Sequence, residues 1–379
     1  MVARWGSPHP SAPLVVALHG NGTSEHSLIE IAPWLPHGPV AYVAVRGPLE
    51  RPTGFAWFLD AAGGGTDRDS LAATCAWFLD WLEAEGDPAR PVILLGFREG
   101  VTLAGALMFT APERFAGAVL LYGALPLDAG LPVAPGCLAG MPVFLAHGTA
   151  DPRTPAAALD NTWEWLHSYS GAPLWAEREP GGAQLAGRVV AQVGTWLADR
   201  LDFLRAHGEN PLPDGAEPAW PSVPGGRLPA RAGEAPAVTT GIPQHQLSQN
   251  APPHLQARLW AQLAELPAVT TGPTAVGVAG TRALRLDRGG AAAGPDAAYI
   301  LPADGEFAHM HPEPDGSLHL VLPDALAYDV LAKGWALAHP LAGLRVSPGM
   351  VLVPGPRDED EVAIVAGIAA ASHRYAVGG

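Results

Sequence analysis

Pro91-Val92-Ile93-Leu94-Leu95-Gly96-Phe97-Arg98-Glu99-Gly100 decides the fold of the first half of this chain. An apolar run ends in Gly-Phe-Arg-Glu-Gly, and residues 101–109 continue with helical spacing. This is the strand–tight turn–helix context of a G-x-S-x-G motif, whose glycines permit a strained turn and close backbone packing. Arg98 stands in place of the serine nucleophile. A guanidinium stays protonated and only donates hydrogen bonds, so it cannot attack an acyl carbon.

Strand-like and helix-like segments alternate on both sides of this turn. Strands are expected at residues 14–18, 40–45, 118–122, 143–146 and 174–177, and helices at 70–85, 156–166 and 189–204. Strands that alternate with helices at this spacing are typical of a doubly wound parallel sheet. The sequence therefore predicts an α/β domain over residues 1–207.

Composition limits the classes of partner. The chain has 379 residues and a net charge of -15, which argues against nucleic acid or an anionic membrane, because both need a basic surface. No apolar run has the length of a membrane span, and residues 1–13 lack a leader-like apolar stretch, so we expect a cytoplasmic protein. The usage of Pro, Gly and Arg, with Lys333 as the single lysine, indicates a GC-rich bacterial source. The oligomeric state is left open.

The composition changes near residue 208. Prolines recur without periodicity over residues 208–250, which predicts an extended linker. Beyond it, an amphipathic helix at 253–266 is followed by short strand-like runs and by helices at 323–334 and 362–372. A small α+β domain is therefore expected over residues 251–379.

Histidines are concentrated in this second domain. Residues 306–322 read as strand, turn and strand, with the turn at Asp315-Gly316. Residues two apart on a strand share a face, so His309 and His311 project together, and His319 joins them from the returning strand.

Three imidazoles on one sheet face are a plausible first shell for zinc, iron or copper. Glu306, Glu313 or His339 would add a further ligand. The alternative is that the histidines form hydrogen bonds within a half-buried sheet or bind an organic ligand. The cluster therefore predicts a ligand site, with a divalent metal as one of the open choices.

Residues 14–204 resemble the phospholipase/carboxylesterase branch of the α/β-hydrolases. The resemblance rests on six short motifs in the right order, at residues 18–22, 46–48, 56–58, 96–100, 147–152 and 180–182. It implies that Asp151 is the triad acid, that the nucleophile maps to Arg98, and that the base after Gly181-Gly182 maps to Ala183.

Two of the three triad members are therefore replaced, and a triad works as a unit. We expect no ordinary serine-esterase activity, and the domain becomes a binding or structural module. The alternative is an active carboxylesterase or thioesterase that recruits a non-standard nucleophile such as Ser70, Ser168 or Ser170.

The turn still offers a pocket. The glycine loop His19-Gly20-Asn21 is where such folds place an oxyanion-hole amide. Arg98 at a helix N-terminus suits a carboxylate or phosphate, and neighbouring Glu99 could neutralise it. The favoured alternative is that Arg98 is simply tolerated after catalysis was lost.

Residues 252–377 resemble a small domain named "luciferase domain" in bacterial and fungal proteins of mostly unknown function. The resemblance rests on motifs at 306–311, 316–319, 334–340 and 356–359. It implies that His309, His311, His319 and His339 form the site of the second domain. It does not imply light emission. A purely structural, partner-binding protein is the third possibility.

Overall fold

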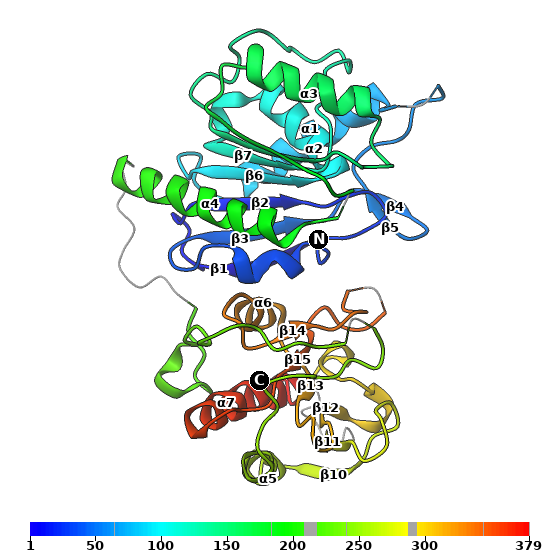
Figure 1. Cartoon of the computed structure of the whole chain (residues 1–379), viewed down its shortest axis with the longest axis vertical. Coiled ribbons are helices and arrows are strands. Elements are labelled where there is room, and N and C mark those ends of the chain that lie inside the picture. The colour runs from blue at the N-terminus through cyan, green and yellow to red at the C-terminus, as the bar shows by residue number, and fades with distance from the viewer. Residues whose placement is uncertain are drawn as a thin grey trace. The chain divides into compact units, whose positions relative to one another are not determined.

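The computed structural model describes residues 1–63, 65–182, 184–207, 218–239, 241–286, 294–343 and 345–378. The chain divides into two compact units, Met1–Glu217 and Pro218–Gly379 (Figure 1). None of the helices in these ranges combines the length and the apolarity that a bilayer crossing requires. The cytoplasmic location, the bacterial source and the absence of a nucleic-acid partner stay predictions.

The first unit is built on a seven-stranded sheet in the order β1-β3-β2-β6-β7-β8-β9. Its strands are β1 (Val2–Gly6), β2 (Leu14–Leu18), β3 (Ala41–Val45), β6 (Val92–Phe97), β7 (Gly117–Leu121), β8 (Val143–Gly148) and β9 (Leu174–Glu179). All neighbours are parallel except β1, which pairs antiparallel with β3. The predicted α/β class with a doubly wound sheet is confirmed. The antiparallel edge strand was not foreseen.

Helices cover both faces of this sheet (Figure 1). They are α1 (Arg68–Ala84), α2 (Glu99–Thr110), α3 (Ala156–Ser168) and α4 (Gly187–His207), with short 3-10 helices η1 (Ile29–Trp34) and η2 (Pro112–Arg114) and a hairpin of β4 (Leu49–Arg51) and β5 (Gly54–Ala56). Phe78 of α1 and Leu107 of α2 belong to the core on one face. On the other face, Trp196 of α4 packs on Phe144 of β8, with 6.3 Å between the ring centroids.

The second unit is an antiparallel sheet in the order β10-β11-β12-β13-β15-β14, with helices beside it. Its elements are η3 (Pro224–Gly226), α5 (Pro253–Ala264), β10 (Val269–Pro273), β11 (Arg282–Leu286), η4 (Asp296–Ala298), η5 (Pro302–Asp304), β12 (Glu306–Met310), β13 (Leu318–Val321), α6 (Asp324–Ala332), β14 (Leu337–Ala338), β15 (Met350–Val353) and α7 (Glu359–Ala376). This agrees with the expected α+β class.

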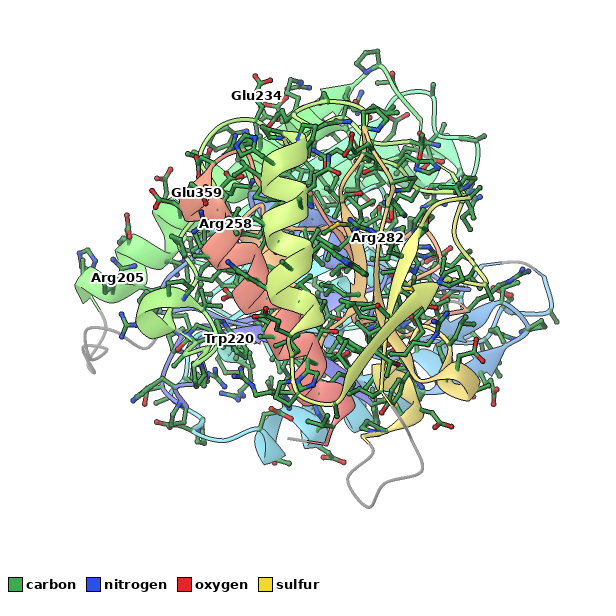
Figure 2. All side chains as sticks on the ribbon, turned by 90° about the horizontal axis from the view of Figure 1, so that it is seen from below. Arg205, Trp220, Glu234, Arg258, Arg282 and Glu359 are labelled. Carbon is green, nitrogen blue, oxygen red and sulfur yellow. The ribbon has the colours of Figure 1, made fainter. Side chains whose placement is uncertain are left out.

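Helices α5 and α7 lie against each other (Figure 2). Arg258 of α5 and Glu359 at the start of α7 form an exposed ion pair at 2.9 Å. The apolar face of α5 buries Leu255, Leu259 and Leu263, as its spacing predicts.

Most of the expected linker belongs to the second unit. Trp220 Nε1 donates to the buried Asp329 carboxylate at 2.6 Å, and Arg231 pairs with Glu361 at 3.0 Å. Val223 and Leu228 are buried. The prediction of an extended linker over residues 208–250 is therefore wrong for its described residues from 218 onward, and residues 208–217 lie outside the described part. Proline suppresses periodicity, but it does not prevent an extended segment from packing through its other side chains.

We expect Trp220→Phe to destabilise the second unit by about 1–3 kcal/mol, because a buried carboxylate loses a donor. Hydrogen–deuterium exchange should become faster in α6, which carries Asp329, and stay unchanged in α2. The matched control is Trp175→Phe, whose exposed ring donates to Glu177 at 3.2 Å. Equal, small effects of both substitutions would show that residues 218–250 are not part of the unit's folded structure.

Candidate functional site

The turn between β6 and α2 keeps the backbone of a nucleophile elbow without its nucleophile. Arg98 has φ 53° and ψ -117°, in the left-handed region that a large side chain rarely adopts. A Cβ on Gly96 would lie 2.6 Å from the Gly100 carbonyl oxygen, and one on Gly100 would collide with the Leu18 carbonyl. Arg98 N–H donates to Leu121 O at 2.9 Å. The strained geometry is therefore preserved around a residue that cannot perform the chemistry.

A cavity of about 400 Å³ opens at this turn. Its lining includes the side chains of Arg98 and Glu99 with Asn21 and Thr102, and apolar walls from Phe58, Leu125, Pro126, Pro155 and Ala158. Exposed Asp60, Asp128 and Arg153 also line it. The cavity has the size of a small-molecule pocket and mixed charge.

The carboxylate of Glu99 is already hydrogen-bonded to a backbone amide of the glycine loop 19–21. Its Oε2 accepts from the Asn21 N–H at 2.9 Å. Burial lowers the pKa of Arg98, as does the nearby Arg153, whereas the carboxylates of Glu99 and Asp151 oppose this. An amide of the loop for which the sequence predicts an oxyanion-hole donor is thus bonded to a carboxylate of the same chain.

Asp151 stands where the triad acid is expected. Its Oδ1 accepts from the backbone N–H groups of Arg153 (2.8 Å) and Thr154 (3.4 Å), and its buried Oδ2 has no hydrogen-bond partner in the described part of the chain. Gly181 O accepts from Ala150 N–H at 3.0 Å, which brings the Gly-Gly segment to this turn. Ala183, the replacement of the base, lies outside the described residues.

His19 holds the loop instead of lining the pocket, contrary to the expectation. Its Nδ1 donates to Gly20 O at 2.8 Å, and its Nε2 accepts from Gly47 N–H at 3.0 Å. The ring is fully buried, and burial lowers its pKa. Neither His19 nor Gly20 lines the cavity, whereas Asn21, Arg98 and Glu99 do.

The serines proposed as substitute nucleophiles also lie elsewhere. Ser70 Oγ accepts from Leu59 N–H at 2.8 Å at the start of α1, and buried Ser170 donates to Leu166 O at 2.6 Å. Ser168 is the last residue of α3. None of the three lines the cavity at Arg98.

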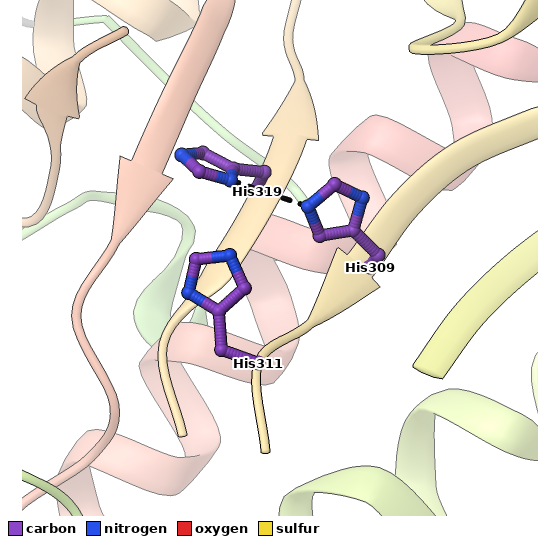
Figure 3. Close-up of side chains that lie close together, drawn as sticks. All are labelled: His309, His311 and His319. Atoms are coloured by element: carbon purple, nitrogen blue, oxygen red, sulfur yellow. Dashed lines mark hydrogen bonds between the residues drawn. The ribbon is translucent and has the colours of Figure 1, made fainter. Parts of the chain in front are cut away.

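In the second unit the three strand histidines meet, as the alternation of strand side chains predicts. His309 of β12 lies directly opposite His319 of β13, and His311 follows two residues after His309. Their side chains point toward one another (Figure 3). One ligand nitrogen from each ring lies within 4.8 Å of the others, so the group could hold a metal ion. All three residues are buried.

Each ring is bonded on its outer side to an acceptor. His309 Nδ1 lies 2.8 Å from Glu306 Oε1, His311 Nδ1 lies 2.9 Å from Asp315 Oδ2, and His319 Nε2 lies 3.1 Å from an amide oxygen, Gln244 Oε1. A carboxylate or amide oxygen accepts, so each ring nitrogen on this side carries the proton. When a ring carries only this proton, its opposite nitrogen is a bare acceptor.

Two of these bare nitrogens face each other. His309 Nε2 and His319 Nδ1 are 3.2 Å apart. Burial lowers the pKa of both rings; Glu306 opposes this at His309, and the neighbouring imidazoles reinforce it at His319. A shared proton is therefore disfavoured, and two facing lone pairs repel. The arrangement fits a cation between the rings.

A second group, His245, His311 and Asp315, could also hold a metal by position. The carboxylate at its centre is already saturated. Oδ1 accepts from the N–H (3.0 Å) and the hydroxyl (2.5 Å) of Ser317, and Oδ2 accepts from His311, His245 and Gln246 N–H. Burial raises the pKa of Asp315, but the bonds from His311 and Ser317 hold it well below its usual range. This group positions His311 instead of competing for a metal.

The other residues expected as metal ligands belong to neither of these two groups. The His339 ring lies 5.2 Å from the His319 ring, and its Nδ1 accepts from Leu341 N–H at 3.2 Å. Glu306 acts on His309 from outside the group and also accepts from Thr274 at 2.8 Å. Glu313 belongs to neither group. The contacts of Asp315 with His311 and of Gln244 with His319 were not predicted, because the sequence indicates a turn at Asp315 and a linker at Gln244.

Each unit is similar to one known protein family. Residues 6–171 match the Phospholipase/Carboxylesterase family, and residues 304–372 match the Luciferase domain family. The predicted resemblance of both parts is confirmed. The chain combines a phospholipase/carboxylesterase-like hydrolase domain with a luciferase-like domain.

Individual relatives match one part each. "Putative hydrolase MhqD" of Bacillus subtilis is 24% identical over 193 residues, which cover 50% of this chain and 94% of that protein. Acyl-protein thioesterase 1 of Cryptococcus neoformans is 28% identical over 159 residues, 36% of this chain and 66% of that protein. A Bacillus cereus carboxylesterase crystal structure is 26% identical and covers 52% of this chain and 93% of its own, with a TM-score of 0.46.

The second unit matches fungal luciferases over a short stretch. The luciferase of Armillaria ostoyae is 45% identical over 74 residues, which are 18% of this chain and 27% of the luciferase. The chain thus spans about a quarter of the length of that relative. The family match, at residues 304–372, includes His309, His311 and His319 but not Gln244 or His245.

Proposed function

We propose that the second unit binds one divalent transition-metal ion through His309, His311 and His319, and that the first unit is a hydrolase-like module without serine-hydrolase activity. The observation that supports the metal is the pair of bare imidazole nitrogens 3.2 Å apart in a buried site. The first unit then serves binding or structure, and chemistry or ligand recognition belongs to the second.

The spacing of the nitrogens suits a tetrahedral ion. Zinc–nitrogen bonds of about 2.0–2.1 Å at tetrahedral angles place two ligands about 3.3 Å apart. Three imidazoles leave a fourth position open, as in catalytic sites, and imidazole suits zinc, copper and iron. Glu306 and Asp315 supply the outer carboxylates that commonly fix metal-binding histidines and raise their basicity.

Three losses support the module assignment of the first unit. Arg98 replaces the nucleophile, Ala183 replaces the base, and Glu99 fills the loop amide. Each loss alone affects a different step of acyl transfer, namely attack, proton transfer and oxyanion stabilisation. The alternative requires a recruited serine, and no serine is among the described residues that line the cavity.

The metal content of the tag-free protein tests the proposal. After removal of metal and reconstitution with zinc, we expect about one ion per wild-type chain and none in His309→Ala/His311→Ala, because only one bare nitrogen remains. The control is His207→Ala/His254→Ala, which removes two exposed histidines. A wild type without metal, or equal metal in all three proteins, would contradict the assignment.

A further inference from the structure

We infer that Gln244, from the segment first assigned to a linker, is a positioning residue of the metal site that selects the tautomer of His319. This inference rests on the proposed metal function. Gln244 is buried and contacts His319 across 75 residues of sequence. It lies outside residues 304–372, the part that matches the domain family.

The orientation of the Gln244 amide is set by its other end. Its Nε2 donates to Ala338 O at 3.1 Å, so its Oε1 must face His319 Nε2, also at 3.1 Å. An amide oxygen only accepts, so the His319 proton is held on Nε2. Nδ1, which faces His309, is thereby kept bare. Reversal of the amide would place its oxygen against the carbonyl oxygen of Ala338, two acceptors without a proton between them, and is disfavoured.

His319 is the ring whose tautomer most needs this help. His309 and His311 are bonded to carboxylates, which hold a ring proton strongly, whereas His319 has a neutral amide as its outer partner. A neutral imidazole without an outer acceptor distributes its proton between both nitrogens. A proton on Nδ1 would point at His309 Nε2 and occupy the metal position.

The segment around Gln244 is firmly held, so the amide is delivered at a fixed place. His245 Nδ1 bonds to Asp315 Oδ2 at 3.0 Å, and Gln246 Oε1 accepts from Gly355 N–H at 2.9 Å. Gln246 Nε2 also donates to Ser248 O at 2.9 Å. These bonds make residues 244–246 a wall of the site, and we assign the functional unit to residues from 218 onward, a range that begins before residues 304–372, the part that matches the domain family.

Gln244→Met tests the inference against a matched substitution, Gln249→Met. Gln249 lies in the same segment and also makes two bonds, to Glu234 O (3.0 Å) and from Arg357 (3.3 Å), but it contacts none of the three ligand histidines. We expect zinc affinity, measured by chelator competition, to fall about 10–100-fold in Gln244→Met and to stay unchanged in Gln249→Met. Gln244→Glu keeps an acceptor at His319 but loses the donor to Ala338 O, so it should recover part of the affinity.

The tautomer itself gives a second readout that needs no metal. Nitrogen NMR of the metal-free protein should show the His319 proton on Nε2 in the wild type and in Gln249→Met, and on both nitrogens in Gln244→Met. Near-UV circular dichroism checks that all variants keep their fold. A wild type that binds zinc with an unchanged Gln244→Met would overturn the inference and leave the proposed function standing. If the wild type takes up no zinc, the proposed metal function is contradicted. If the His319 tautomer is also unchanged in Gln244→Met, the role of Gln244 in tautomer selection is contradicted as well.

Discussion

Arg98→Ser alone is expected to leave the first unit without esterase activity, even though the elbow that would present the serine is intact. The resemblance assigns the position of the base to Ala183, so the restored hydroxyl is expected to lack a base, and its oxyanion would meet a loop amide already bonded to Glu99. Loss of the base alone costs about as much as loss of a whole triad, roughly 10⁶-fold in turnover.

Labelling by a fluorophosphonate probe and turnover of short acyl esters measure this. Wild type and Arg98→Ser should both stay at background, and signal is expected only in the combined variant Arg98→Ser/Glu99→Ala/Ala183→His. Labelling of Arg98→Ser would show that Glu99 and Ala183 are no obstacle. Labelling of the wild type would support the alternative of a non-standard nucleophile. Loss of that labelling in Asp151→Ala would then show that the reaction depends on Asp151.

Gly100→Ala is expected to abolish the cooperative unfolding transition of the first unit. The added Cβ collides with the Leu18 carbonyl of the neighbouring strand, and neither backbone can move without breaking the sheet. We expect a loss of at least about 4 kcal/mol, which places the substitution among the most severe. Calorimetry should show the transition of the second unit unchanged.

Gly187→Ala at the start of α4 is the control for this substitution. A Cβ there meets nothing within 4 Å, so the helix should gain stability by up to about 1 kcal/mol. A first unit that unfolds alike in both variants would mean that β2 and the elbow are not packed as closely as the structure has them.

The features that could be predicted from the sequence are those with local signals. The parallel sheet and the elbow follow from strand and helix periodicity and from Gly96 and Gly100, whose spacing fixes the turn. The meeting of His309, His311 and His319 follows from the alternation along two strands joined by a short turn. Such patterns extend over a few residues and can be recognised without knowledge of the fold.

The features that could not be predicted depend on contacts distant in sequence. Glu99 contacts Asn21 across 78 residues of sequence, and Gln244 contacts His319 across 75. A glutamate or a glutamine in the sequence does not indicate which distant residue it will contact. Prolines hid the packing of residues 218–250 because extended segments have no period to detect. His19 was misplaced because a glycine loop indicates a backbone turn but not the direction of its neighbouring ring.

The bond between Glu99 and Asn21 has a consequence for what the cavity can hold. A group tethered in the same chain competes at an effective concentration of roughly millimolar or above. A free carboxylate with the same intrinsic affinity for this amide must exceed that concentration to displace the Glu99 carboxylate. An anionic ligand that needs the Asn21 amide therefore has to compete with a carboxylate that is already in place.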